Sequence, residues 1–141
     1  MIGYHYTSYD DWLQIKKDGL VPYLIYKPEL QKYFPNQAIM GIWVWKQRFH
    51  GAPHAGSVLH QVAFKATPHV VLLSVDYSPN DILKYQWPET KEWGEVNLTH
   101  DGNIEQWIYH TGKEESVIVT KRISPSHIKL LKEYDIVELL K

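Results

Sequence analysis

The segment "GYHYTSYDDWLQIKKDGL", residues 3–20, decides the first unit of the fold. Residues 2–7 have the composition of a short strand, and His5 lies in its middle. Ser8 is a preferred N-cap residue, and Asp11 follows three positions later, as in a capping box. These residues predict a strand that runs directly into a helix over residues 9–18.

Gly19 and Leu20 mark the end of this helix. Glycine adopts a left-handed conformation at little steric cost, so we expect Gly19 at the position that closes the helix. Leu20 then falls where its side chain can reach back to Ile15, which is the hydrophobic contact of a Schellman motif. The sequence therefore predicts a Schellman end.

The rest of the sequence predicts mostly strands. Apolar runs with β-branched residues predict strands over residues 39–45, 58–64, 69–77 and 115–123, a short one near 106–110, and a last one around 134–140. Residues 78–86 predict one or two helical turns, and residues 124–131 predict a helix with Ser124 as N-cap and Pro125 at its first position. Because strands outnumber helices and several neighbours are hairpin-like, we predict a single α+β domain, residues 1–141, with mostly antiparallel sheets.

Composition argues against several classes of protein. The 15 basic and 16 acidic residues nearly balance, and no block of like charge points to a polyanion or an acidic membrane surface. Arg48 and Arg122 are the only two arginines, the residue type that binds phosphate in a bidentate manner. There is no cysteine for a disulfide, a thiol nucleophile or a cysteine-ligated zinc. The first residues do not resemble a signal peptide and no stretch is apolar enough to span a membrane, so we expect a cytoplasmic protein.

The common nucleotide and metal motifs are missing from the sequence. No GxGxxG follows a strand, and no GxxxxGK[ST] loop occurs. His50, His54 and His60 lie in one glycine-rich stretch, but their spacing matches no helical metal-binding pattern and no nearby acid completes a ligand set. We interpret them as loop histidines and expect no metal site.

Aromatic side chains are the unusual feature, with six Trp and ten Tyr. Strand alternation places Trp43 and Trp45 on one face of the strand over residues 39–45. Such side chains either fill a core or stack against a flat ligand in a groove, and the sequence leaves both interpretations open. Tyr23, Tyr26 and Tyr33, in the preceding segment, are rival stacking residues.

Three pieces of the sequence occur in a recognisable order. They are "YHYTS" followed by "WLQIKKDGLVP", then "GIWVW", then "EESVIVTKRISPSHI". This order resembles the ADP-ribosyltransferase superfamily, in its diphtheria-toxin-like branch with a His, aromatic, Glu catalytic set. In that branch a first strand carries His before a hydroxyl residue and leads into a helix that ends in Gly-Leu. A Gly-Ile-aromatic strand follows, and a Glu-led strand runs into Ile-x-Pro-x-x-Ile.

The resemblance implies an ADP-ribosyltransferase-like fold, in which two mostly antiparallel sheets with short helices form a central NAD cleft. It implies that Glu115 is the catalytic residue, that His5 and Thr7 bind the dinucleotide, and that Trp43 and Trp45 line the nicotinamide pocket. NAD would be a co-substrate, and no metal would be needed. A carboxylate on the ribose 2′-hydroxyl stabilises the oxocarbenium charge more in the transition state than in the ground state.

Two of these assignments have alternatives. Glu114 is the rival of Glu115, because strand alternation sends the two carboxylates to opposite faces and the family spacing alone favours Glu115. The structural alternative for His5 is an imidazole whose tautomer is held by a backbone carbonyl in a half-buried strand. The charged run that contains both glutamates can also be a solvated strand end.

The implied function is NAD-dependent mono-ADP-ribosyl transfer to a macromolecular acceptor, either nucleic acid or protein. A small transferase of this kind suits a toxin or an effector in phage conflict, and an immunity partner is a further expectation from the habits of the family. The alternative is a module on the same fold that binds a nucleotide or a peptide without catalysis. A purely structural or interaction protein is the third hypothesis.

Overall fold

A computed structural model of the chain describes residues 1–25, 30, 34–46, 67–86, 88–95 and 116–135. The elements in chain order are β1 (Ile2–Ser8), α1 (Tyr9–Asp18), β2 (Tyr23–Leu24), β3 (Met40–Trp45), β4 (His69–Asp76), the 3₁₀ turn η1 (Pro79–Asp81), β5 (Lys84–Gln86), β6 (Trp93–Glu95), β7 (Ser116–Val119), the 3₁₀ turn η2 (Pro125–His127) and β8 (Ile128–Asp135). The architecture is α+β, as the sequence predicts.

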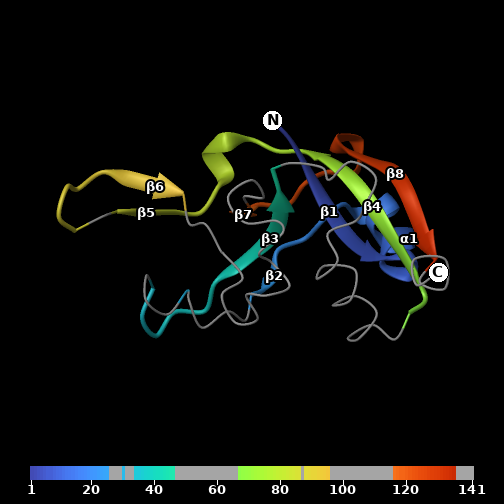
Figure 1. Ribbon diagram of the computed structural model, residues 1–141, viewed down its shortest axis with the longest axis horizontal. Coiled ribbons are helices and arrows are strands. Elements are labelled where there is room, and N and C mark those ends of the chain that lie inside the picture. Colours follow the sequence, from blue (N-terminus) through green and yellow to red (C-terminus); the bar gives the residue numbers. More distant parts are fainter. Residues whose placement is uncertain (26–29, 31–33, 47–66, 87, 96–115, 136–141) are drawn as a thin grey trace.

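Strands pair into one large sheet and one small ribbon, and every pairing among the described strands is antiparallel. The large sheet has the order β2-β3-β1-β4-β8, and β7 also pairs with β3. β5 and β6 form a two-stranded hairpin that extends away from the large sheet (Figure 1). Strands from both ends of the sequence therefore belong to one sheet, with β1 in the interior of the strand order and β8 at its edge.

The strand-to-helix unit forms as predicted. β1 runs into α1 at Ser8, whose hydroxyl accepts a hydrogen bond of 3.1 Å from the N–H of Asp11. This bond satisfies one of the N–H groups that the first helical turn leaves without a partner in the helix. Acidic residues in the first turn and basic residues in the last turn of α1 also suit the helix dipole.

The Schellman prediction at the helix end is wrong. Gly19 does have a positive φ, of 80°, and its N–H donates to the carbonyl of Ile15. The N–H of Leu20, however, donates to the carbonyl of Ile123 at 2.9 Å, and the N–H of Ile123 returns a bond of the same length to Leu20. A bridge to a distant segment replaces the local hydrogen bond of a Schellman motif.

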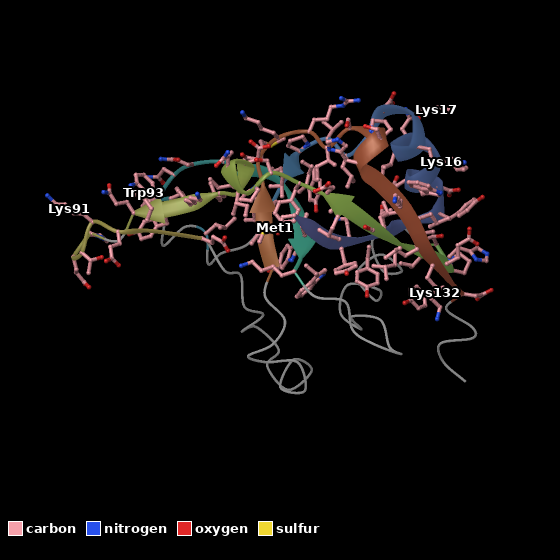
Figure 2. All side chains as sticks on the ribbon, turned by 90° about the horizontal axis from the view of Figure 1, so that it is seen from above. Met1, Lys16, Lys17, Lys91, Trp93 and Lys132 are labelled. Carbon is pink, nitrogen blue, oxygen red and sulfur yellow. The ribbon has the colours of Figure 1, made fainter. Side chains whose placement is uncertain are left out.

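The large sheet buries side chains on both faces. One cluster packs Trp12 and Ile15 of α1 against alternate residues of β3, β4 and β7. The other face carries two clusters, one built around Tyr6, Trp45, Val70, Leu72 and Tyr134 and the other around Ile118. Figure 2 shows α1, which carries Lys16 and Lys17, along one side of the sheet. When both faces of a sheet are buried, the sequences of its strands are nearly continuous apolar runs, as the sequence of β4 is.

The predicted helix over residues 124–131 is wrong. Ser124 and Pro125 do precede a turn, but the turn is the single 3₁₀ turn η2, and β8 begins at Ile128. β8 pairs with β4 from Ile128 to Asp135, so the sheet supplies the backbone hydrogen bonds that a helix would have made internally. Residues 78–86 form one turn, η1, and then β5. The predicted strands over 58–64 and 106–110, and residues 136–140 of the last predicted strand, lie outside the described residues.

Candidate functional site

His5 and Thr7 lie on one face of the sheet, and the indoles of Trp43 and Trp45 lie on the other. Tyr4 pairs with Trp45, so these two side chains share a face, and alternation along β1 sends His5 and Thr7 to the opposite face. The partners in β4 agree with this assignment: His5 pairs with Leu73 and Thr7 with Val71, which belong to the cluster beneath α1. The four side chains therefore do not converge on one pocket wall.

The backbone of Trp43 is nevertheless in direct contact with His5. The Nδ1 atom of His5 lies 2.7 Å from the carbonyl oxygen of Trp43, and the N–H of Trp43 donates to the Tyr23 hydroxyl at 3.2 Å. β1 pairs with β3 only through Tyr4 and Trp45, so the ladder between the two strands ends next to this point. The side chains of His5 and Tyr23 thus provide the hydrogen-bond partners of the Trp43 carbonyl and N–H.

The electrostatic state of His5 follows from this contact. A carbonyl oxygen only accepts hydrogen bonds, so Nδ1 carries the proton and donates. Burial lowers the pKa of His5, and this effect outweighs the hydrogen bond to Trp43 and the charge of Asp11, which both raise it. The imidazole is therefore neutral near pH 7, and its Nε2 lone pair is an acceptor.

Thr7 and Tyr23 are two further polar side chains of this region. Thr7 is buried, and its hydroxyl donates a long hydrogen bond of 3.5 Å to Asp11 in the first turn of α1. Tyr23 is 42% exposed as a whole residue, and the partial burial of its hydroxyl group raises the pKa of Tyr23. The hydroxyl therefore stays protonated and keeps its position as an acceptor for Trp43.

The two tryptophans differ in their surroundings. Trp45 is 4% exposed and packs in the cluster with Tyr6, Leu72 and Tyr134. Trp43 is half-buried and packs against both clusters on this face, and its ring centroid lies 6.0 Å from that of Trp45. Core filling accounts for Trp45, whereas Trp43 is only half-buried.

The predicted catalytic residue lies just outside the described part of the chain. Glu115 and its rival Glu114 fall within the range 96–115, which the structure does not describe, and the same is true of Tyr26, Tyr33 and the three loop histidines. Ser116, the next residue after Glu115, begins β7 and pairs with Trp45. Among the described residues, no group of three or more His, Asp or Glu side chains is placed to hold a metal ion.

The pieces of sequence that carry the family resemblance are in contact with one another. His5 of the first piece touches Trp43 of the second, and β7 of the third piece pairs with β3 along four residues. Gly19 and Leu20, at the end of the first piece, lie against Ile123 of the third. A Cβ atom on Gly19 would stand 2.2 Å from the carbonyl oxygen of Ile123, so only glycine allows this approach.

Sequence reasoning missed two features of this site. Asp11 was assigned only to helix capping, yet it also contacts Thr7 and acts on His5 through its charge. Tyr23 was considered only as a stacking residue, yet its hydroxyl holds the backbone of Trp43. The spacing of Thr7 and Asp11 across the helix start was the one available signal for the first feature.

The chain was compared with known protein families, curated proteins and solved structures. No family model matches the chain, and no curated protein and no solved structure matches it. Among the described residues, no helix is long and apolar enough to cross a membrane.

Proposed function

We propose that the protein is an NAD-dependent mono-ADP-ribosyltransferase with an ADP-ribosyltransferase-like fold. The observation that supports the proposal is the mutual contact of the three family-like segments, which are far apart in the sequence. Contact between His5 and Trp43, the ladder between β3 and β7, and the bridge between Leu20 and Ile123 join them.

His5 has the hydrogen-bonding properties that binding a ribose hydroxyl of NAD requires. A neutral imidazole with Nδ1 bound to the Trp43 carbonyl is fixed in orientation, so Nε2 can accept a hydrogen bond from a ribose hydroxyl. The same hydrogen bond also agrees with the structural alternative for His5, since it accounts for the buried imidazole without any ligand.

Glu115 is proposed as the residue that promotes cleavage. The bond between C1′ of the ribose and the nicotinamide nitrogen breaks, and its electron pair leaves with nicotinamide, which becomes neutral. A carboxylate that accepts a hydrogen bond from the 2′-hydroxyl stabilises the resulting oxocarbenium charge. The acceptor nucleophile then bonds to C1′ and loses a proton. The acceptor is proposed to be a nucleic acid or a protein of the same compartment, the cytoplasm.

Only one of the two tryptophans, Trp43, is proposed to stack against nicotinamide. Trp45 has almost no free surface, so its role in this proposal is to support β3. Trp43 is half-buried and is the proposed stacking residue of the pair. Because its indole lies on the face opposite His5, a nicotinamide ring stacked on Trp43 would not also touch the His5 imidazole.

Nicotinamide release from labelled NAD, measured with a cell lysate as acceptor, tests the proposal. Glu115→Gln should reduce release at least about a hundredfold, because it removes one transition-state charge contact. Glu114→Gln is the matched control and should remain active. Both variants should keep the thermal stabilisation by millimolar NAD, since a ligand of the native state raises its stability. Equal release by all three proteins excludes Glu115 from the mechanism, and nuclease or protease treatment of the labelled product identifies the acceptor class.

A further inference from the structure

A cavity of about 420 Å³ lies away from His5, where the end of β4 and the turn η1 face the segment between β7 and η2. Its volume is in the range of pockets that bind small organic molecules. None of the residues around His5 described above lines it. Arg122, the arginine of the two that the structure describes, is part of its wall.

Backbone hydrogen bonds hold the walls of this cavity in place. The N–H of Tyr77 donates to Met1, and the N–H of Thr120 donates to the carbonyl of Asp81, at 2.9 and 2.8 Å. The bridge between Leu20 and Ile123 secures the remaining wall. The cavity is therefore preformed, which lowers the entropic cost of binding a ligand.

The acidic groups in the wall already have cationic partners. The carboxylate of Asp76 lies 2.8 Å from the Met1 ammonium group, and that of Asp81 lies 3.7 Å from Lys121. The Met1 ammonium, first through its hydrogen bond, lowers the pKa of Asp76, and the charge of His127 acts in the same direction. These pairs leave the wall with the uncompensated positive charge of Arg122.

Arg122 is held in a way that leaves its terminal nitrogens for a ligand. Its Nε donates to the carbonyl of Asp18 at 2.7 Å, which anchors the guanidinium at the end of α1. In the described part of the chain, no carboxylate forms an ion pair with it. The two terminal nitrogens can then bind two oxygens of one phosphate group. His127, from the same wall, is a second donor.

We propose that this cavity binds a phosphate monoester whose phosphate is held by Arg122 and whose organic group lies against the apolar atoms of Met1 and Pro79. Both of these wall residues are exposed, whereas Tyr77, Val119 and Ile123 belong to the buried core behind the wall. A free phosphate ion would leave this part of the cavity unused. The inference does not depend on the proposed transferase activity, because it concerns a different part of the molecule.

Titrations with phenyl phosphate, followed by the backbone amide signals of the folded protein, test the proposal. Signals of residues 76–82 and 119–127 should shift, with saturation at millimolar concentration or below. Phenol should not shift them, inorganic phosphate should bind more weakly, and phenylacetate should be weaker than phenyl phosphate. Shifts confined to other residues, or equal binding of phenylacetate, would overturn the assignment.

Single substitutions test which side chains of the cavity wall bind phenyl phosphate. Arg122→Gln should weaken phenyl phosphate binding about tenfold or more, and Arg122→Lys should fall between the two, because lysine keeps the charge but loses the bidentate geometry. Lys91→Gln is the matched loss of one positive charge, on the β5–β6 hairpin far from Met1 in Figure 2, and should leave binding unchanged. Asp76→Asn should bind phenyl phosphate as well as or better than the unaltered protein. Weaker binding by Asp76→Asn, or equal effects of Arg122→Gln and Lys91→Gln, contradicts an anion site.

Discussion

Substitution of Gly19 by alanine should strongly destabilise the fold. Gly19 has φ 80° and ψ −175°, a region that only glycine adopts readily, and forcing another residue into it costs about 1–3 kcal/mol. A Cβ atom would also stand 2.2 Å from the carbonyl oxygen of Ile123, so the two backbone hydrogen bonds between Leu20 and Ile123 must lengthen or break. Each such bond contributes about 0.5–1.5 kcal/mol net. The expected loss is therefore about 2–6 kcal/mol of a stability that is typically about 5–15 kcal/mol.

Urea denaturation of three variants measures this loss. Gly19→Ala should show it fully, and Lys17→Ala, on the exposed last turn of the same helix, should change the free energy of unfolding by less than about 0.5 kcal/mol. Gly19→Asn should lose as much as Gly19→Ala, because asparagine tolerates a positive φ in the left-handed helical region but not at a ψ of −175°. A loss under about 1 kcal/mol for Ala, or recovery of most of it by Asn, would show that this position does not require glycine.

Two further substitutions test the site. Burial lowers the pKa of His5 in the folded protein, so the unfolded chain binds more protons below pH 6.5 and His5 contributes a loss of stability as the pH falls from 7 to 5. His5→Asn, whose amide can still donate to Trp43, should flatten this pH dependence in denaturation experiments; an unchanged slope would mean that His5 does not titrate in this way. Trp45→Ala should cost about 3–5 kcal/mol by chemical denaturation, because the indole is 4% exposed, whereas Trp93→Ala, at 66% exposure on β6 (Figure 2), should cost little. Similar losses for both would contradict the assignment of Trp45 to the core.

The sequence was most informative where structure depends on near neighbours. The start of α1 followed from Ser8 and Asp11, because an N-cap bond joins residues three positions apart. The shared face of Trp43 and Trp45 followed from the two-residue period of a strand. β4 followed from its apolar run. Each of these predictions required only covalent geometry and hydrogen bonds within a few residues.

Predictions failed where a distant segment offered the backbone a better partner. A helix was expected over residues 124–131 because Ser124 and Pro125 are good helix-starting residues, yet residues 128–131 begin β8, which pairs with β4 through seven residue pairs. Leu20 was expected to complete a local helix end, yet Ile123 takes its N–H. Capping preferences contribute about 1 kcal/mol, and a whole strand ladder with buried side chains outweighs them.

The sequence by itself determined which residues alternate along each strand, where α1 begins, and that His5 lies within a strand beside hydroxyl and aromatic residues. Only the tertiary structure decided that His5 and the two indoles occupy opposite faces, that the Trp43 carbonyl fixes the imidazole, and that Arg122 faces a cavity. The physical reason is register: pairing between strands that are distant in the chain sets which faces and edges meet, and no periodicity within one segment contains that information.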